Sequence, residues 1–378
     1  MNIKNDQVHE GLDGVVAFES SISHIDGAVP ELVIRGYDIN DIVNNLTYEQ
    51  MAYLLLYGDL PNTTQLSNFD EELKSFRNVP SLILDFLSNV PKTSHPMAVL
   101  RTAISMLGCI DLDSELTEKD SVLIKLKSLI AQIPTIVAAQ ARILNGQIPV
   151  EPDLSLSHSS KYYYMVTGVI ADEKILNAFE AVLVIYAEHE INASTFACRV
   201  VMGTESDIYS SVVAGISAIK GPLHGGAIDG SMNMFMEIGS KENSERYVKN
   251  ALSNKRKLPG FGHRVYRTGD PRAQVLKRMT LELANTRHDS KWFDIAVEAE
   301  YQMSIQKGII PNVDYYAAPL LYHIGFPVIL MTNVVTSSRI AGWAAHILEQ
   351  YGNNRLIRPR AEYIGPEYPQ QFVELSQR

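Results

Sequence analysis

Apolar residues recur at helical spacing along most of the chain. Between positions 172 and 189, the apolar residues that share one helical face are Ile175, Ala178, Phe179, Val182, Leu183 and Tyr186. An i, i+3, i+4 repeat of this kind predicts an amphipathic helix. The same repeat predicts helices at 123–144, where Pro134 indicates a break or kink, and at 209–219, 273–284, 292–307 and 338–351.

Local signals mark the ends of two more helices. Thr47 and Gln50 have the spacing of a capping box, which predicts a helix that continues to Tyr57. The sequence Gly-Asp-Leu-Pro at 58–61 ends it, and a second helix is predicted over about 96–108. Residues 14–30 predict short strands and turns. Since convincing long strands, internal repeats and low-complexity linkers are absent, the sequence predicts a mostly α-helical fold with no domain border visible in its composition.

One uncharged stretch, at 315–338, is long enough to cross a bilayer. It contains Pro319, Gly325, Pro327 and Asn333, which do not suit a membrane span. We therefore predict two buried pieces joined by a turn at 325–327 and no membrane partner. The first six residues lack the apolar core of a signal peptide, so we expect none there.

Composition narrows the class of protein. The 378 residues are 46% apolar and 20% charged, as in ordinary folded proteins, and the length suggests one large domain or two unequal ones. The net charge of -10 argues against nucleic acid as the main partner. Cys109 and Cys198 have no metal-type or redox-type neighbour at CxxC spacing, so we expect two buried structural thiols in a reducing cytoplasm.

Three histidines lie in unusual local sequences. His189 ends the helix predicted at 172–189, and a helix-capping role is the alternative to ligand binding. It begins a HExxH-like motif, but Ala193 replaces the second zinc ligand. His224 precedes two glycines that bring backbone close to a ligand or simply form a turn. His263 follows Gly-Phe-Gly, which is not a dinucleotide fingerprint because Val265 replaces its third glycine.

Charged residues near these histidines have two possible roles each. A basic cluster around His263 predicts either a polyanion site or a solvated face, and consists of Lys255, Arg256, Lys257, Arg264 and Arg267. Asp314 opens the uncharged stretch, where partial desolvation raises its basicity unless it merely caps a helix. For Arg272, Arg339 and Arg358, a surface salt bridge is the alternative to substrate binding.

Together these segments resemble the citrate synthase family, whose motifs they match in order over nearly the whole chain. The matching segments are His189–Ser194, Gly221–Gly226, Gly260–Arg272, Pro311–Asp314, Ser338–Trp343 and Arg358–Ala361. The resemblance implies an all-α, two-domain homodimer. It implies a discontinuous large domain at 1–222 and 330–378, and a small domain at 223–329 that closes over the active site.

The resemblance also implies a role for each residue. Asp314 matches the base that deprotonates acetyl-CoA, His224 the donor to the thioester oxygen, and His263 the residue that polarises oxaloacetate. The matches to oxaloacetate ligands are His189, Arg272, Arg339 and, from the partner subunit, Arg358. The matches to coenzyme A contacts are Leu258, Gly260, Gly262 and Arg267. The resemblance implies no metal and no redox cofactor, because the coenzyme A thioester is a substrate.

The resemblance leaves three functions open. We expect citrate synthase activity, in which acetyl-CoA condenses with oxaloacetate and citryl-CoA is hydrolysed. The nearest alternative is 2-methylcitrate synthase, which uses propionyl-CoA and shares every residue named above; one methylene in an apolar pocket discriminates by only about 1–3 kcal/mol. A non-catalytic relative is the third possibility, and the presence of His224, His263 and Asp314 argues against it.

Overall fold

A computed structural model describes residues 8–116, 118–367 and 369–378, and helices dominate them. The first half contains α1 (Ile39–Asn45), α2 (Tyr48–Tyr57), α3 (Thr63–Ser75), α4 (Ser81–Asn89), α5 (Pro96–Ile110), α6 (Lys119–Leu144), α7 (His158–Thr167) and α8 (Glu173–Tyr186). The second half contains α9 (Ala193–Met202), α10 (Ile208–Ile219), α11 (Ala227–Ile238), α12 (Ser244–Ser253), α13 (Pro271–Arg287), α14 (Lys291–Lys307), α15 (Val313–His323) and α16 (Met331–Gly352).

The strands form a single small antiparallel sheet in the described part of the chain. It consists of β1 (Ser23–Asp26), β2 (Glu31–Ile34) and β3 (Tyr37–Asp38), in that order. β1 and β2 make a hairpin in which Ser23 lies opposite Ile34 and Asp26 opposite Glu31. Short 3-10 turns complete the fold: η1 (Glu10–Leu12), η2 (Lys241–Asn243), η3 (Val328–Leu330) and η4 (Leu375–Gln377). The prediction of an all-α fold, with short strands near the N-terminus, is confirmed.

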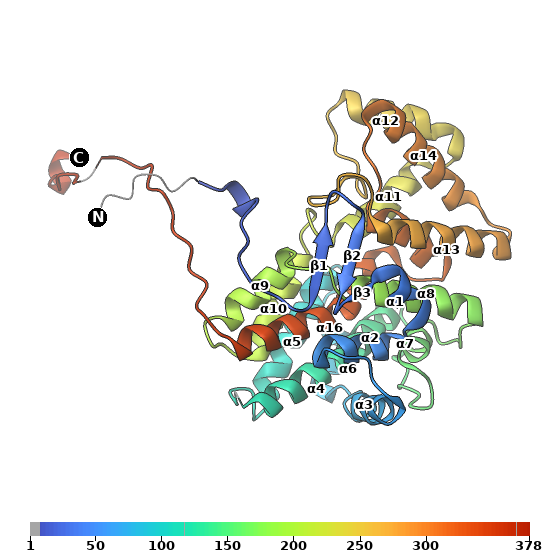
Figure 1. The fold of residues 1–378 in the computed structure, drawn as a ribbon, viewed down its shortest axis with the longest axis horizontal. Helices are drawn as coiled ribbons and strands as arrows, with labels where there is room; N and C mark the ends of the chain where they lie inside the picture. The colour runs from blue at the N-terminus through green and yellow to red at the C-terminus, as the bar shows by residue number, and fades with distance from the viewer. Residues whose placement is uncertain (1–7, 117, 368) are drawn as a thin grey trace.

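The core is built around α16, which is buried from Met331 to Ile347. Figure 1 shows α11–α14 grouped at one end of the molecule, the hairpin β1–β2 beside them, and the remaining labelled helices below. One continuous apolar cluster includes residues on both sides of position 222, such as Ile216 and Ile228. The division into two domains at 222 and 330 stays a prediction.

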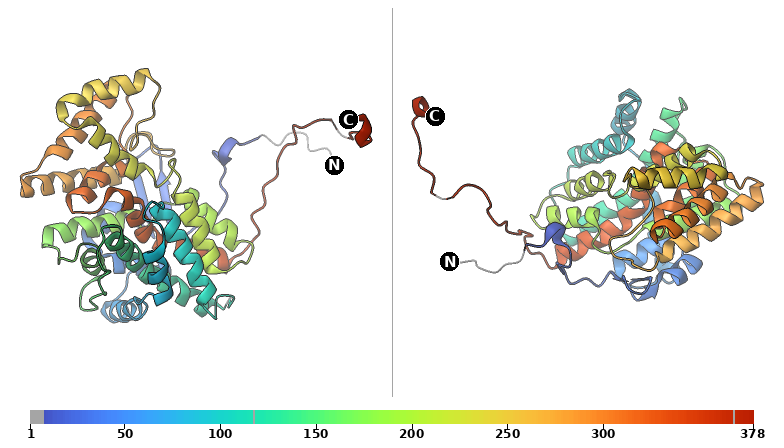
Figure 2. Two further views of the ribbon diagram at one scale, coloured as in Figure 1. Left: turned by 180° about the vertical axis from the view of Figure 1, so that it is seen from behind. Right: turned by 90° about the horizontal axis from the view of Figure 1, so that it is seen from above.

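The two terminal segments leave this body together. Figures 1 and 2 show that residues 8–22, before β1, and the segment after α16 extend away from the helices on the same side of the molecule. Their apolar side chains are largely exposed: Val16 is 91% exposed, Ile364 92% and Phe372 100%. Exposed apolar side chains in extended segments are typical of a surface that another chain covers.

Local sequence signals explain several helix boundaries. The capping box of Thr47 and Gln50 is present at the start of α2, and Gly58 ends that helix in the left-handed conformation. The stretch 315–338 forms the buried helices α15 and α16, joined through a turn at Gly325, as predicted. The helix in the described chain that is long and apolar enough to cross a membrane is α6. Its apolar window is 78% buried inside the protein, as expected of a core helix.

Four expectations need correction. The helix that starts at Lys119 runs through Pro134 without a break, because a long helix buried by its neighbours tolerates one missing N–H group. α8 ends at Tyr186, so His189 lies in the following loop rather than at a helix end. α16 begins at Met331 rather than near 338, since its first turns are uncharged and buried. Cys198 is buried but Cys109 is exposed, on the outer side of α5 near its end.

Candidate active site

The fold brings the three sequence-predicted histidines, Asp314 and two arginines together from distant segments. The rings of His189 and His263 contact each other edge to face, with their centroids 5.2 Å apart. Both rings also pack against Tyr266, at 5.6 Å and 4.6 Å. Nε2 of His189 lies 3.3 Å from the Tyr266 hydroxyl. The loop after α8 and the loop before α13 therefore meet at this point.

Asp314 lies in the first turn of α15. The side chain of Asn312 caps this helix by accepting the N–H of Asp314 at 3.0 Å. The Asp314 carboxylate in turn accepts a hydrogen bond from the Tyr186 hydroxyl at 2.7 Å. Burial raises the pKa of Asp314 to about 6, against the lowering influence of Tyr186 and of the nearby cation Arg272. The result is a carboxylate that is ionised at neutral pH and more basic than usual.

Arg272 is held by a two-point ion pair with Asp270. Its Nε and one terminal nitrogen donate to the two Asp270 oxygens at 2.9 Å and 2.8 Å, and the side chain is 2% exposed. Asp270 also accepts the backbone N–H of Val313 at 2.9 Å. This carboxylate therefore orients the guanidinium and fixes the start of α15, where Asp314 lies.

Arg339 comes from the buried middle of α16. Its Nε donates to the carbonyl oxygen of Tyr186 at 2.5 Å, and the residue is 4% exposed. Burial lowers its pKa to about 10, partly opposed by the Glu188 carboxylate, so it remains a cation at neutral pH. Two buried guanidinium groups thus lie close enough to Asp314 to influence its charge.

His224 precedes α11 and contacts a polar group on α9. Its Nε2 lies 2.8 Å from Oγ of Ser194, which also accepts from the Trp343 indole at 3.1 Å. The Ser194 hydroxyl itself donates to Oδ1 of Asn192 at 2.7 Å, and the same oxygen of Asn192 accepts the backbone N–H groups of Ser194 and Thr195 at 3.1 Å. Burial lowers the pKa of His224 to about 4, so the imidazole is neutral at pH 7.

His263 is fixed by its own loop. Its Nδ1 accepts the backbone N–H groups of Val265 and Tyr266 at 3.0 Å and 3.2 Å, which places the imidazole proton on Nε2. Burial, with Arg272 nearby, lowers the pKa of His263 to about 4. Burial also lowers the pKa of His189 well below its ordinary value. All three histidines are therefore neutral hydrogen-bonding groups at pH 7.

The segment from Leu258 to Gly262 forms a tight loop against the start of α15. Gly260 has φ +77°, and a Cβ at this residue would lie 2.5 Å from Ser231 Oγ. The Gly260 carbonyl accepts from the Asn312 N–H at 2.8 Å, and the Gly262 N–H donates to Ile310 at 2.9 Å. Leu258 is buried, whereas the side chain of Arg267 is exposed.

Arg358 is the one predicted site residue that the fold of a single chain does not bring to this cluster. It is exposed in the segment that leaves the body after α16. Its role stays a prediction that depends on a second copy of the chain.

A buried polar chain lies behind the cluster. Glu188 is fully buried and accepts from the Ser23 hydroxyl at 2.8 Å and from Nε2 of His346 at 3.1 Å. Nδ1 of His346 lies 3.0 Å from a terminal nitrogen of Arg199. Burial acts to raise the pKa of Glu188, but His346 and Arg339 together hold it below its ordinary value. Glu188 is therefore an anion close to the Arg339 cation.

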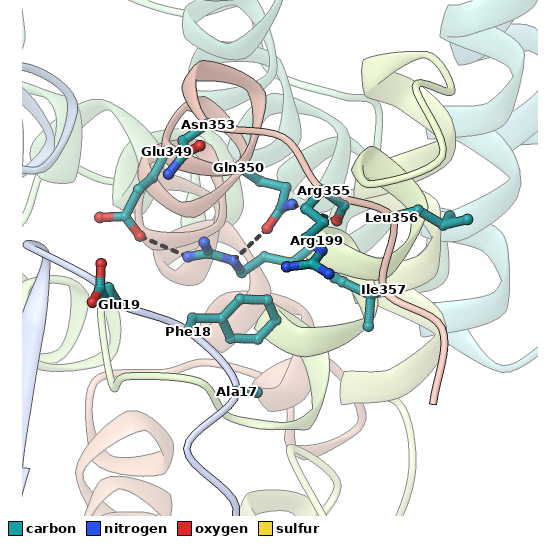
Figure 3. Close-up of a pocket in the computed structure, with 10 residues that line it drawn as sticks. All are labelled: Ala17, Phe18, Glu19, Arg199, Glu349, Gln350, Asn353, Arg355, Leu356 and Ile357. Atoms are coloured by element: carbon teal, nitrogen blue, oxygen red, sulfur yellow. Dashed lines mark hydrogen bonds and ion pairs between the residues drawn. The ribbon is translucent and has the colours of Figure 1, made fainter. Parts of the chain in front are cut away.

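Arg199, at the end of this series of hydrogen bonds, lines a separate cavity of about 520 Å³ where the terminal segments leave the body. Figure 3 shows Arg199 crossing it above the ring of Phe18 and bonded to Glu349 and Gln350. The guanidinium carbon lies 4.3 Å from the Phe18 ring centroid. None of the sequence-predicted site residues lines this cavity.

Sequence reasoning missed the residues that hold the site groups in place: Tyr186, Glu188, Ser194, Tyr266, Asp270, Asn312 and Trp343. Asp270 had a local signal, since it lies two residues before Arg272 and precedes a proline at a helix start. Among the described residues, no group of three or more histidine, cysteine, aspartate or glutamate side chains could hold a metal ion.

The fold and this cluster define an all-α enzyme with two neighbouring arginines and one basic carboxylate. Residues 11–360 match the family model described as citrate synthase, C-terminal domain. The chain is 44% identical to citrate synthase 2 of Bacillus subtilis over 369 residues, covering 97% of this chain and 98% of the relative. It is 37% identical to 2-methylcitrate synthase 1 of Corynebacterium glutamicum over 381 residues, covering 100% of both.

A solved structure gives the same result. The fold matches citrate synthase from the thermophilic archaeon Thermoplasma acidophilum, in ternary complex with carboxymethyl coenzyme A and oxaloacetate, with a TM-score of 0.93. That match has 31% identity and covers 98% of this chain and 100% of the other. The chain belongs to the citrate synthase family, and it is a transferase.

Proposed function

We propose that the protein condenses acetyl-CoA with oxaloacetate and hydrolyses the citryl-CoA that forms. The observation that carries this proposal is Asp314, a carboxylate with a pKa of about 6 beside the buried cations Arg272 and Arg339. A base of this strength suits removal of a weakly acidic C–H proton near neutral pH. Two guanidinium groups suit the two carboxylates of oxaloacetate.

The first step transfers a proton from the acetyl methyl group to Asp314. As the C–H bond breaks, charge develops on the thioester oxygen, and a neutral His224 donates a hydrogen bond to it. Its pKa of about 4 supports this role, because a neutral imidazole stabilises the enol without becoming a strong acid. The barrier to enol formation is thus lowered in two ways: by a base with a raised pKa, Asp314, and by a hydrogen-bond donor in a fixed position, His224.

The second step forms the carbon–carbon bond. The enol carbon attacks the ketone carbon of oxaloacetate, and the ketone oxygen becomes an alkoxide. His263 donates from Nε2 to that oxygen and supplies its proton, while Arg272, Arg339 and His189 hold the substrate carboxylates. Water then attacks the thioester carbonyl of citryl-CoA, so that citrate and the free thiol of coenzyme A leave.

Coenzyme A binding would use the loop of Leu258, Gly260 and Gly262. In this proposal their backbone contacts the ligand, and the exposed side chain of Arg267 contacts a phosphate. The side chains of Lys255, Arg256 and Lys257 supply further positive charge nearby. The proposed reaction needs no metal and no redox cofactor, because every step moves protons and electron pairs with no net oxidation or reduction.

We further propose a homodimer in the cytoplasm, with Arg358 of each chain reaching the oxaloacetate site of its partner. The exposed apolar residues of the terminal segments support an exchange of these segments between two copies. Arg358 follows α16 by only a few residues, so it lies at the root of the segment rather than at its tip.

Acetyl-CoA is the donor that we propose, with propionyl-CoA as the second candidate because the relatives include 2-methylcitrate synthases at 37–39% identity. The test is release of coenzyme A thiol by the purified protein with oxaloacetate and each thioester in turn. A higher kcat/KM with acetyl-CoA would support the proposal. A clear preference for propionyl-CoA would replace it with methylcitrate synthesis, and no release with either thioester would overturn both.

A further inference from the structure

The hairpin β1–β2 contacts both histidine-bearing loops of the site. At its root, Ser23 Oγ donates to Glu188 at 2.8 Å and accepts the N–H of Glu190 at 3.2 Å, on either side of His189. At its turn, the Gly27 carbonyl accepts from the Arg267 N–H at 2.9 Å. One short element of the N-terminal region therefore bridges the loop of His189 and the loop of His263.

The turn packs on the His263 loop without room for a side chain. A Cβ added to Gly27 would lie 2.4 Å from the carbonyl oxygen of Val265 and 3.1 Å from its carbonyl carbon. The obstacle is backbone, which cannot rotate away as a side chain does. Ala28, the next residue in the turn, makes a second hydrogen bond to this loop, since the Thr268 hydroxyl donates to its carbonyl at 3.2 Å.

Val265 is also the residue that holds the His263 imidazole. Its backbone N–H donates to Nδ1 of His263 at 3.0 Å. Gly27 therefore presses on one side of the same residue whose N–H fixes the tautomer and direction of the ring. A shift of Val265 by the hairpin moves the imidazole directly, through one residue and one hydrogen bond.

We propose that the turn of hairpin β1–β2, through Gly27, is a positioning element for His263. It fixes the position of the Val265 backbone, so that Nε2 of His263 points at the reacting ketone oxygen. The inference rests on the proposed function for its effect on turnover. Its structural part, the orientation of the His263 ring, does not depend on which thioester reacts.

The variant that tests this is Gly27→Ala. The backbone of Gly27 is not in the left-handed region, so alanine fits its conformation and the change adds only the contact with Val265. We expect kcat to fall roughly tenfold to a hundredfold, because a misplacement of about 1 Å has that effect on a positioned group. KM for the thioester should change less than kcat, since Leu258, Gly260 and Gly262 lie outside the displaced residue and the exposed side chain of Arg267 ends in solvent.

The matched control is Val29→Ala in the same hairpin turn. Val29 is 59% exposed, and its backbone N–H bonds within the turn to Asp26. This variant should keep the kcat of the parent protein. A second variant, Thr268→Val, removes the tie to Ala28 without the clash and should lower kcat by roughly two- to fivefold, in line with one neutral hydrogen bond. It keeps the inference testable if Gly27→Ala folds poorly.

The deciding measurement is the 15N resonance of Nδ1 of His263 in protein labelled at histidine, assigned with His263→Asn. In Gly27→Ala it should shift or broaden, whereas in Val29→Ala it should not. An unchanged His263 resonance in Gly27→Ala overturns the inference, even if kcat falls. If the parent protein turns over no thioester, the proposed function fails, but the resonance still decides whether the hairpin orients His263.

Discussion

The hydroxyl of Tyr186 donates a 2.7 Å hydrogen bond to Oδ1 of Asp314, across 128 positions of sequence. Tyr186 is the last residue of α8 and Asp314 lies in the first turn of α15, so the bond joins two helix ends. Burial disfavours the charged carboxylate, whereas the tyrosine bond favours it. These two effects, with the charges of Arg272, Asp270 and Arg339, set the pKa of Asp314 at about 6.

Removal of this bond should make Asp314 harder to ionise. In Tyr186→Phe, burial acts without the opposing hydrogen bond, so the pKa of Asp314 rises above 6. Because a general base works in its ionised form, the acid limb of kcat/KM should move to higher pH. Loss of a charged hydrogen bond of about 1.4 kcal/mol raises the pKa by about 1, so the rate should fall roughly twofold at pH 7 and roughly tenfold at pH 5, where Asp314 is mostly protonated in both proteins.

The measurement is the pH profile of thiol release between pH 5 and pH 9. Tyr162→Phe is a matched control, since the Tyr162 hydroxyl contacts Ser337 at 3.0 Å in the core and not Asp314. An acid limb at the same pH in Tyr186→Phe and in the parent protein would contradict this account of the base.

Removal of the carboxylate charge should stop the reaction but not the binding of oxaloacetate. Asp314→Asn keeps the size of the side chain and cannot accept the methyl proton, so we expect kcat to fall by at least about a thousandfold. Oxaloacetate affinity, measured by calorimetry, should stay within a few-fold because its carboxylates are held by Arg272 and Arg339. Asp207→Asn, at the cap of α10, serves as a control. Comparable turnover in Asp314→Asn would remove this residue from the mechanism.

Local patterns predicted the helices whose buried face is apolar and whose ends carry a cap. The capping box of α2 and the apolar stripe of α8 are such cases. The sequence did not predict α7, because the buried residues of this helix include His158 and Lys161 and so form no apolar stripe. It did not predict α12 because this helix has few apolar residues, of which Val248 and Ala251 are buried. A hydrophobicity pattern cannot detect a helix whose buried face is polar or very short.

The predicted site residues came from short motifs, and their partners came from the fold. Within a motif, neighbours such as Asp270 and Arg272 are two positions apart, so their pairing has a local basis. The contact between Tyr186 and Asp314 depends on how α8 packs against α15, which no spacing along the chain encodes. The same holds for the close approach of Gly27 to Val265.

The charge of Glu188 should stabilise the fold. Its side chain is fully buried, and His346 and Arg339 hold its pKa below the ordinary value, so its stabilising contribution is present at neutral pH. That contribution is lost as the pH falls through the lowered pKa of the folded state. Glu188→Gln should therefore lower the free energy of unfolding at pH 7 by about 3 kcal/mol, as for breaking a buried pair.

Urea denaturation at pH 7 and at pH 4 measures this effect. The difference between Glu188→Gln and the parent protein should be smaller at pH 4, where the carboxylate begins to gain a proton. Glu72→Gln is the comparison, because Glu72 is half-exposed in its 2.6 Å pair with Lys127 and should matter by about 0–1 kcal/mol. Equal effects of the two variants at pH 7 would contradict the assigned role of Glu188.

Two impaired variants should restore activity when they form mixed dimers, if Arg358 acts in the partner's site. Arg358→Ala should weaken oxaloacetate binding by roughly ten- to a hundredfold, as for loss of a charged hydrogen bond. In a mixed dimer with Asp314→Asn, one site carries both changes and the other carries neither. Random pairing on co-expression makes about half of the dimers mixed, so about a quarter of the parent activity should return at low oxaloacetate.

The two variants purified separately and mixed without subunit exchange are the control. If co-expression gives no more activity than that control, or if the parent protein is active as a monomer, Arg358 does not serve the partner's site.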